Sequence, residues 1–189
     1  MSSGTQFSKK HVAATLFAVL VAMLAVACGS DSGASGGGET VVERVVDDGR
    51  TYTVEDIRSA LGVKVVKDYD VDELPEALEA WNAIYNQLDH EIRFYASHAD
   101  AVEHGTLYAD SVTGADAVVT GDGVLWEEGR KDRRKCSRAA QTPHSSCSYS
   151  ARYLEYIIRG NMILFCEGDE SSEAFANCES FMKLTEPAA

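Results

Sequence analysis

The chain has 189 residues, of which 45% are hydrophobic, 25% charged and 8% aromatic. This is the composition of an ordinary globular protein, and it excludes collagen-like, coiled-coil and porin-like chains. With 30 acidic against 17 basic residues the formal charge is -13. This balance argues against nucleic acid as a partner, because an acidic chain repels phosphate backbones.

The first 28 residues predict an export signal. Lys9 and Lys10 precede an apolar run over residues 12–27, and Cys28 follows it. A run of this length suits the hydrophobic region of a signal peptide better than a membrane span, which needs about 20 residues. A secretory signal or an uncleaved anchor is the alternative.

The end of this run, Ala25-Val26-Ala27-Cys28, resembles the lipobox of bacterial lipoproteins. It departs from that motif at Ala25, where the family more often has leucine. The resemblance implies that residues 1–27 are removed and that Cys28 carries a diacylglyceryl group on its sulfur and a third acyl chain, such as palmitate, on its amine. Two or more chains hold a protein on a bilayer essentially permanently. The expected location is extracytoplasmic, at a bacterial membrane.

Residues 29–38 are almost entirely glycine and serine, so residues 28–38 predict a lipidated cysteine followed by a flexible tether. Residues 39–189 are enough for one extracytoplasmic domain, and they contain no internal repeat. After processing, 15 basic residues face 30 acidic ones, a formal charge of -15. The domain is therefore expected to stand off anionic lipid.

The first half of the domain predicts helices around a short strand. A capping-box pattern at Thr53 and Asp56 starts a helix that Gly62 ends, with Ile57 and Leu61 on its apolar side. Residues 63–66 follow as a strand. A second helix is predicted from Pro75, because apolar residues then recur at helical spacing: Leu78, Trp81, Tyr85 and Leu88.

The middle of the domain predicts a strand and then a helix. Residues 91–97 alternate, with Ile92 and Phe94 on one face and Arg93 on the other, which is typical of a half-buried strand. A helix from Ser97 to Gly114 follows. Gly105 lies on its apolar face, which indicates that this helix closely approaches the sheet.

The last third predicts a hairpin and a final helix. Residues 152–159 and 162–167 are strand-like and are joined by Gly160-Asn161, a two-residue turn signal. A helix then starts at Ser171 or Ser172 and runs to about Leu184. The order strand, helix, hairpin, helix predicts an α+β fold, with a small antiparallel sheet and helices packed on one face.

Four cysteines lie beyond Cys28, an even number in an exported chain, so disulfides are expected. Three pairings are possible. The favoured one joins Cys136 to Cys147 and Cys166 to Cys178. A metal site is not expected, because there is no C-x-x-C pair.

A basic run interrupts the long region 114–150, which has little periodicity. Long irregular segments are usually functional or disordered, so this run is a candidate surface for an anion or an acidic partner. The simpler interpretation, which the composition favours, is a solvated loop that pairs with the protein's own carboxylates. The run consists of Arg130, Lys131, Arg133, Arg134, Lys135 and Arg138.

No catalytic constellation and no cofactor motif emerges. The sequence predicts a non-catalytic lipoprotein that binds or senses an envelope protein, a polymer or a small ligand. Two alternatives stay open: a structural subunit of an envelope complex, or an envelope hydrolase with dispersed catalytic residues. Candidates for that hydrolase are His98, Asp100, Glu103 and His104.

Overall fold

We analysed a computed structural model of the chain, which describes residues 43–136 and 147–185. These residues belong to one compact unit, residues 40–189. The unit is α+β, as predicted, but its main sheet has six strands in the order β1-β7-β8-β4-β3-β2 and is larger than expected. The strands are β1 (Val45–Val46), β2 (Lys64–Tyr69), β3 (Ala77–Tyr85), β4 (Leu88–Tyr95), β7 (Tyr153–Arg159) and β8 (Met162–Glu167).

The sheet is mixed. Its neighbouring strands pair antiparallel except at one edge, where β1 runs parallel to β7 and places Val45 beside Ile158. A separate two-stranded antiparallel sheet consists of β5 (Arg134–Cys136) and β6 (Cys147–Ala151). The predicted antiparallel sheet thus needs two corrections, because it has a parallel edge and a second sheet beside it.

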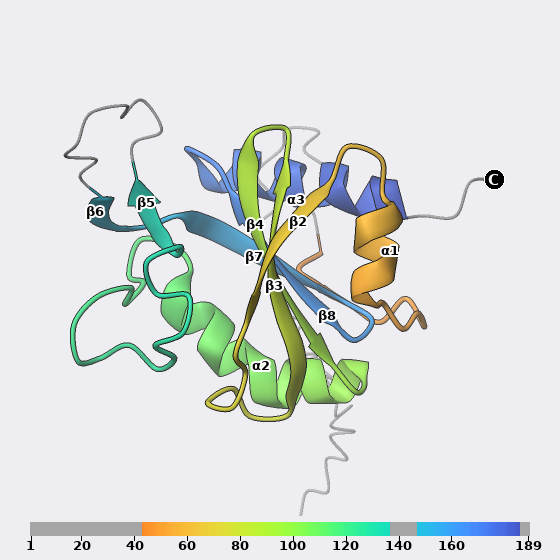
Figure 1. The fold of residues 1–189 in the computed structure, drawn as a ribbon, viewed down its shortest axis with the longest axis horizontal. Coiled ribbons are helices and arrows are strands. Elements are labelled where there is room, and N and C mark those ends of the chain that lie inside the picture. Colours follow the sequence, from red (N-terminus) through yellow and green to blue (C-terminus); the bar gives the residue numbers. More distant parts are fainter. Residues whose placement is uncertain (1–42, 137–146, 186–189) are drawn as a thin grey trace, which may run out of the picture. The chain divides into compact units, whose positions relative to one another are not determined.

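Helices cover both faces of the main sheet, so the prediction that they pack on one face is wrong (Figure 1). α1 (Val54–Ser59) and α3 (Ser171–Thr185) lie on what we call the first face, where Ile57 and Phe181 pack against Ile92 and Leu164. α2 (His98–Val112) lies on the second face. The two faces of β4 and β8 are therefore both buried, and their apolar residues sort into separate cores.

The helix predicted from Pro75 is wrong, because the chain forms strand β3 there and turns directly into β4. The turn residues Asn86 and Gln87 both have positive φ, 49° and 65°. Two such residues form the tight hairpin turn whose twist matches that of the strands. This turn lacks the glycine that usually marks such a hairpin in a sequence. The apolar residues of the two strands happen to recur at helical spacing, and the sequence therefore predicted a helix.

Several local predictions are confirmed. Thr53 caps α1 with a full capping box, Ser97 caps α2 through Asp100, and Gly160-Asn161 forms the turn between β7 and β8. A Cβ at Gly105 would lie 2.8 Å from the Tyr95 hydroxyl, so α2 does approach the sheet closely. Leu61 is the exception, since it is 87% exposed and packs in no core.

Candidate functional site

Residues 113–133, which we call the cover segment, join α2 to β5 without forming helix or strand. Trp126 holds this segment on the second face of the sheet. The indole is 2% exposed, its Nε1 donates to the Asp70 carbonyl at 3.2 Å, and its ring meets the Tyr69 ring edge-on with centroids 5.9 Å apart. A third apolar cluster forms there, in which Trp126 and Tyr69 pack with Leu74 and Ala80.

A buried ion cluster lies beneath the cover segment and consists of Glu91, Arg93 and Arg133. Arg93 Nε donates to Glu91 Oε1 at 2.8 Å, and Arg133 Nε donates to Glu91 Oε2 at 2.8 Å. The side chains of Glu91 and Arg93 are 0% exposed and that of Arg133 is 1% exposed. One carboxylate on the sheet thus binds one guanidinium from its own strand and one from the cover segment.

Arg133 also braces the cover segment itself. Its Nη1 donates to the Trp126 carbonyl at 3.0 Å and its Nη2 to the Glu128 carbonyl at 2.5 Å. Gly129 fits between this guanidinium and Tyr69, because a Cβ there would lie 2.9 Å from Arg133 Nη2 and 2.8 Å from the Tyr69 ring. Arg133 therefore fixes the shape of residues 126–133 and attaches them to Glu91.

Aromatic rings enclose both guanidinium groups. Arg133 Cζ lies 3.9 Å from the Trp126 ring centroid, and Arg93 Cζ lies 4.9 Å from Trp126 and 4.3 Å from Phe165. A cation over an aromatic face contributes about 2 kcal/mol when desolvated. Trp126 therefore contacts both cations at once, which makes it the centre of the attachment.

The electrostatics fix Glu91 in its ionised form. Burial would raise the pKa of this carboxyl, but Arg133 and Arg93 outweigh burial, and the pKa lies below its ordinary value of 4.5. General acid–base catalysis needs a pKa close to the working pH. The cluster is therefore suited to holding the cover segment in place and not to transferring protons.

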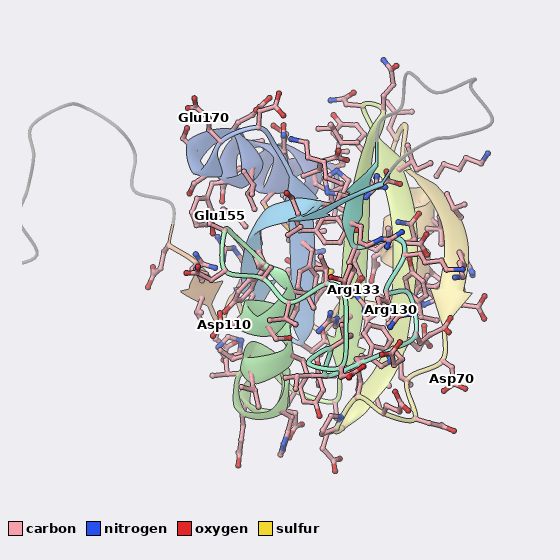
Figure 2. The ribbon with its side chains drawn as sticks, turned by 90° about the vertical axis from the view of Figure 1, so that its left-hand side faces the viewer. Asp70, Asp110, Arg130, Arg133, Glu155 and Glu170 are labelled. Atoms are coloured by element: carbon pink, nitrogen blue, oxygen red, sulfur yellow. A yellow bond between two sulfur atoms is a disulfide. The ribbon has the colours of Figure 1, made fainter. Side chains whose placement is uncertain are left out.

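The predicted basic run does not gather on one surface. Arg133 is buried in the ion cluster, Arg130 pairs with Glu127 at 2.8 Å, and Lys135 pairs with Asp169 at 2.7 Å. Figure 2 shows Arg130 and Arg133 on the same segment beside the sheet. Lys131 is exposed and Arg134 half-buried, while Arg138 lies outside the described residues. Arg133 faces the core and is therefore closed to a partner, and binding of an anion or partner by the other residues of the run stays a prediction.

Two of the four candidates for hydrolysis, His98 and Asp100, make local contacts within the fold. His98 Nδ1 contacts the Gly160 carbonyl at 2.8 Å, and Asp100 accepts a hydrogen bond from Ser97 in the N-cap of α2. A shallow depression between α1 and the ends of β3 and β4, lined in part by Thr53, Leu78 and Tyr95, contains none of the four candidates.

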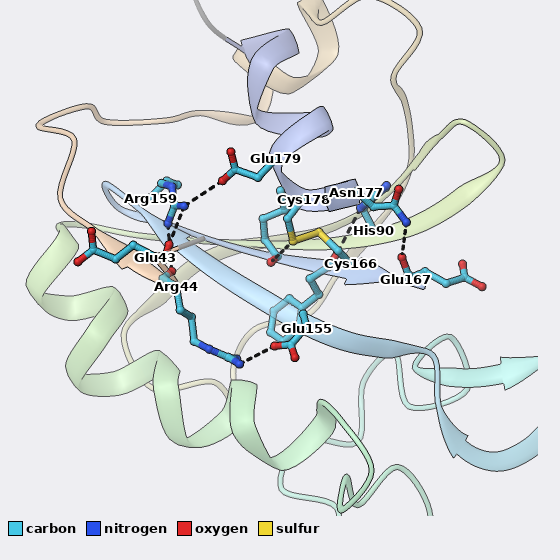
Figure 3. The surroundings of a disulfide bond; sticks show 12 residues. Glu43, Arg44, His90, Glu155, Arg159, Cys166, Glu167, Asn177, Cys178 and Glu179 are labelled. Atoms are coloured by element: carbon cyan, nitrogen blue, oxygen red, sulfur yellow. Dashed lines mark hydrogen bonds and ion pairs between the residues drawn. A yellow bond between two sulfur atoms is a disulfide. The ribbon is translucent and has the colours of Figure 1, made fainter. Parts of the chain in front are cut away.

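Cys166 and Cys178 are joined by a disulfide that links β8 to α3, the pairing that the sequence favours for these two residues. Figure 3 shows the bond beside Asn177, whose amide donates to the Glu167 carbonyl at 2.8 Å. Cys136 and Cys147 are direct partners in the register of β5 and β6. That register brings their backbones together, and a bond between them stays a prediction.

Sequence reasoning missed Glu91, Arg93 and Trp126. Glu91 and Arg93 alternate with Ile92 and Phe94, which is the usual pattern of a strand with one face in water. In the structure both faces of β4 are covered, and the partner that makes the burial of these charges possible, Arg133, lies 42 positions away in the sequence. The one available signal was opposite charge on the same strand face.

Among the described residues, no group of three or more histidine, cysteine, aspartate or glutamate side chains could hold a metal ion. None of the helices in that part of the chain has the length and apolar character needed to cross a membrane. Among curated proteins and among solved structures, none matches the chain. A sequence model of a family of unknown function, DUF6810, matches residues 53–187. This match covers most of the chain and nearly the whole described domain, and the chain therefore belongs to the DUF6810 family of unknown function.

Proposed function

We propose that the chain is a lipoprotein of the bacterial envelope whose domain is a non-catalytic binding module. The observation that carries this proposal is the sequence Ala25-Val26-Ala27-Cys28 at the end of an apolar run, followed by a glycine- and serine-rich tether. Acylated Cys28 would hold the protein on the membrane, and residues 29–38 would let the domain search the space beside it.

The cysteines support an extracytoplasmic address. Disulfides persist in oxidising compartments and are rare in the cytosol. Cys166 and Cys178 form one disulfide, and the backbones of Cys136 and Cys147 face each other across a second strand pair. One disulfide, together with a second cysteine pair whose bond stays a prediction, supports a protein that folds outside the cytoplasm.

The point where the tether enters the domain is firmly attached. Arg44 Nη2 lies 2.5 Å from Glu155 Oε2 (Figure 3). Arg44 Cζ lies 4.6 Å from the centroid of the Tyr156 ring. Arg159 Nη2 donates to the Glu43 carbonyl at 2.8 Å. An anchor at Cys28 would therefore act on the sheet edge at β1, which is the opposite edge from β2.

The binding surface proposed is the outer side of the cover segment. Irregular segments held on a rigid scaffold often carry binding residues, since their side chains are not committed to a regular core. Here the buried attachment through Trp126 and Arg133 supplies the rigidity. Lys131 is exposed, and Arg130 would exchange its pairing with Glu127 for an acidic partner.

Acylation is tested by metabolic labelling with an alkyne-tagged fatty acid. The wild-type chain should take up the label and partition with membranes, and Cys28→Ser should do neither. Ser30→Ala is the matched control, because it changes a nearby residue of the tether and should be labelled like the wild type. Equal labelling of Cys28→Ser and wild type would overturn the anchor.

Binding is tested with charge reversal that spares the core. The double variant Arg130→Glu/Lys131→Glu should reduce co-sedimentation with purified cell-envelope fragments by about tenfold. Lys64→Glu/Lys183→Glu makes the same change in net charge at exposed lysines elsewhere and should bind like the wild type. Equal loss in both double variants would show that total charge, and not the cover segment, governs binding.

A further inference from the structure

Arg93 is held rigidly, yet one end of its guanidinium has no partner. Its Nε and Nη2 lie 2.8 and 2.6 Å from Glu91 Oε1, and the group sits between the rings of Trp126 and Phe165. Among the described residues, nothing accepts a hydrogen bond from Nη1, which is fully buried. A buried guanidinium nitrogen without an acceptor is rare, because the lost hydration is costly.

A second buried donor lies beside it. The Tyr95 side chain is 0% exposed, and its hydroxyl has no hydrogen-bond partner in the described part of the chain. Arg93 and Tyr95 lie two positions apart on β4, which puts both side chains on the same face of the sheet. Burial raises the pKa of Tyr95, so the hydroxyl stays protonated. Gly105 of α2 lies directly against the hydroxyl, which limits how far it can move.

The charge around these donors is unbalanced. The ion cluster contains two guanidinium groups and one carboxylate, all almost completely buried. Arg133 uses Nε, Nη1 and Nη2 on Glu91, Trp126 and Glu128, so its hydrogen bonds are satisfied. The cluster therefore has one excess positive charge, and its unused hydrogen-bond donor is on Arg93. A buried cation of this kind favours an anion over a neutral ligand.

We propose that a small monovalent inorganic anion of chloride size binds to Nη1 of Arg93 and the hydroxyl of Tyr95. The site goes beyond the proposed envelope function, since it would neutralise the interior beneath the cover segment whether or not the chain is acylated. A water molecule could satisfy the same two donors but would leave the charge unbalanced, so the experiments must separate the two.

Bromide provides a direct probe, because it resembles chloride and scatters X-rays anomalously. Crystals of the full chain grown with sodium bromide should show an anomalous peak within hydrogen-bond distance of both Arg93 Nη1 and the Tyr95 hydroxyl. Density without an anomalous signal would identify water, and the absence of density would mean no ligand. Either of these outcomes overturns the proposal.

Thermal unfolding of the full chain in detergent tests the site in solution. At constant ionic strength, replacing sodium gluconate by sodium chloride should raise the unfolding midpoint with the logarithm of the chloride concentration, by about 4 °C for each tenfold increase above the dissociation constant. Arg93→Met should abolish this rise and Tyr95→Phe should reduce it. Tyr153→Phe is the matched control, since Tyr153 is also a fully buried tyrosine whose hydroxyl has no partner among the described residues.

If Arg93→Met does not fold, Tyr95→Phe still decides the question, because it removes only one oxygen atom. A chloride-dependent midpoint that is the same in Tyr95→Phe, Tyr153→Phe and wild type would overturn the site. Identical midpoints in chloride and gluconate for the wild-type chain would also overturn it.

Discussion

Glu91→Gln tests whether the buried carboxylate is what holds the cover segment on the sheet. The substitution keeps the shape of the side chain and removes its charge. Two guanidinium groups, Arg93 and Arg133, then remain buried with no counter-charge between them. Breaking a buried ion pair from one side costs about 3–5 kcal/mol. We expect a loss of that size in the free energy of unfolding.

Arg133→Met is the comparison that separates the effect of charge balance from the effect of lost contacts. That variant removes a cation and leaves the balanced pair Glu91–Arg93. It loses the hydrogen bonds to the Trp126 and Glu128 carbonyls, but Glu128 is only half-buried, so water can partly replace the bond to its carbonyl. The expected cost is about 2 kcal/mol. Glu91→Gln should therefore be the more destabilising change, although Arg133→Met removes more atoms.

The assay is urea-induced unfolding of the purified chain, followed by circular dichroism and tryptophan fluorescence. The double variant Glu91→Gln/Arg133→Met should lose clearly less stability than the two single losses added together, because its second substitution removes one of the uncompensated charges. A smaller effect of Glu91→Gln than of Arg133→Met, or strict additivity, would refute the reasoning from charge balance.

Three further perturbations test other parts of the fold. The pKa of Glu91 is depressed in the folded state, so the contribution of its charge to stability is present above the ordinary pKa of 4.5. That contribution is lost as the pH falls below 4.5 towards the folded pKa. The urea midpoint should therefore fall more for wild type than for Glu91→Gln between pH 7 and pH 3. Gly105→Ala should lower the free energy of unfolding by about 1–2 kcal/mol. The new Cβ would lie 2.8 Å from the Tyr95 hydroxyl, and this overpacking outweighs the gain in helix propensity of roughly 1 kcal/mol. A raised unfolding midpoint would contradict the close packing. Asn161→Ala should lower the free energy of unfolding, measured with urea, by about 3 kcal/mol. The buried Asn161 side chain accepts a hydrogen bond from the Tyr52 backbone N–H at 2.6 Å and donates to the Tyr52 and Tyr95 carbonyls. A loss below about 1 kcal/mol would show that water replaces the side chain.

Features set by neighbouring residues were predictable from the sequence. The Gly160-Asn161 turn, the cap at Ser97 and the close approach at Gly105 each depend on local backbone conformation or on one missing side chain. Each of these needs little knowledge of the rest of the fold. The local signals were therefore sufficient, and the structure agrees with them.

Features set by distant partners were not predictable. Strand β3 exists because it pairs along its length with β2 and β4, and the turn at Asn86 and Gln87 has no glycine to announce it. The burial of Glu91 depends on Arg133, which arrives from the cover segment. A single sequence shows neither the pairing of strands nor the partner of a buried charge.

The most direct measurement of the central claim is the mass of the N-terminal peptide of the native protein after tryptic digestion. The account predicts a peptide of residues 28–44, beginning at Cys28 and carrying the mass of three acyl chains and a glyceryl group. A peptide that continues upstream of Cys28 with an unmodified thiol would contradict it, and would remove both the membrane anchor and the extracytoplasmic address.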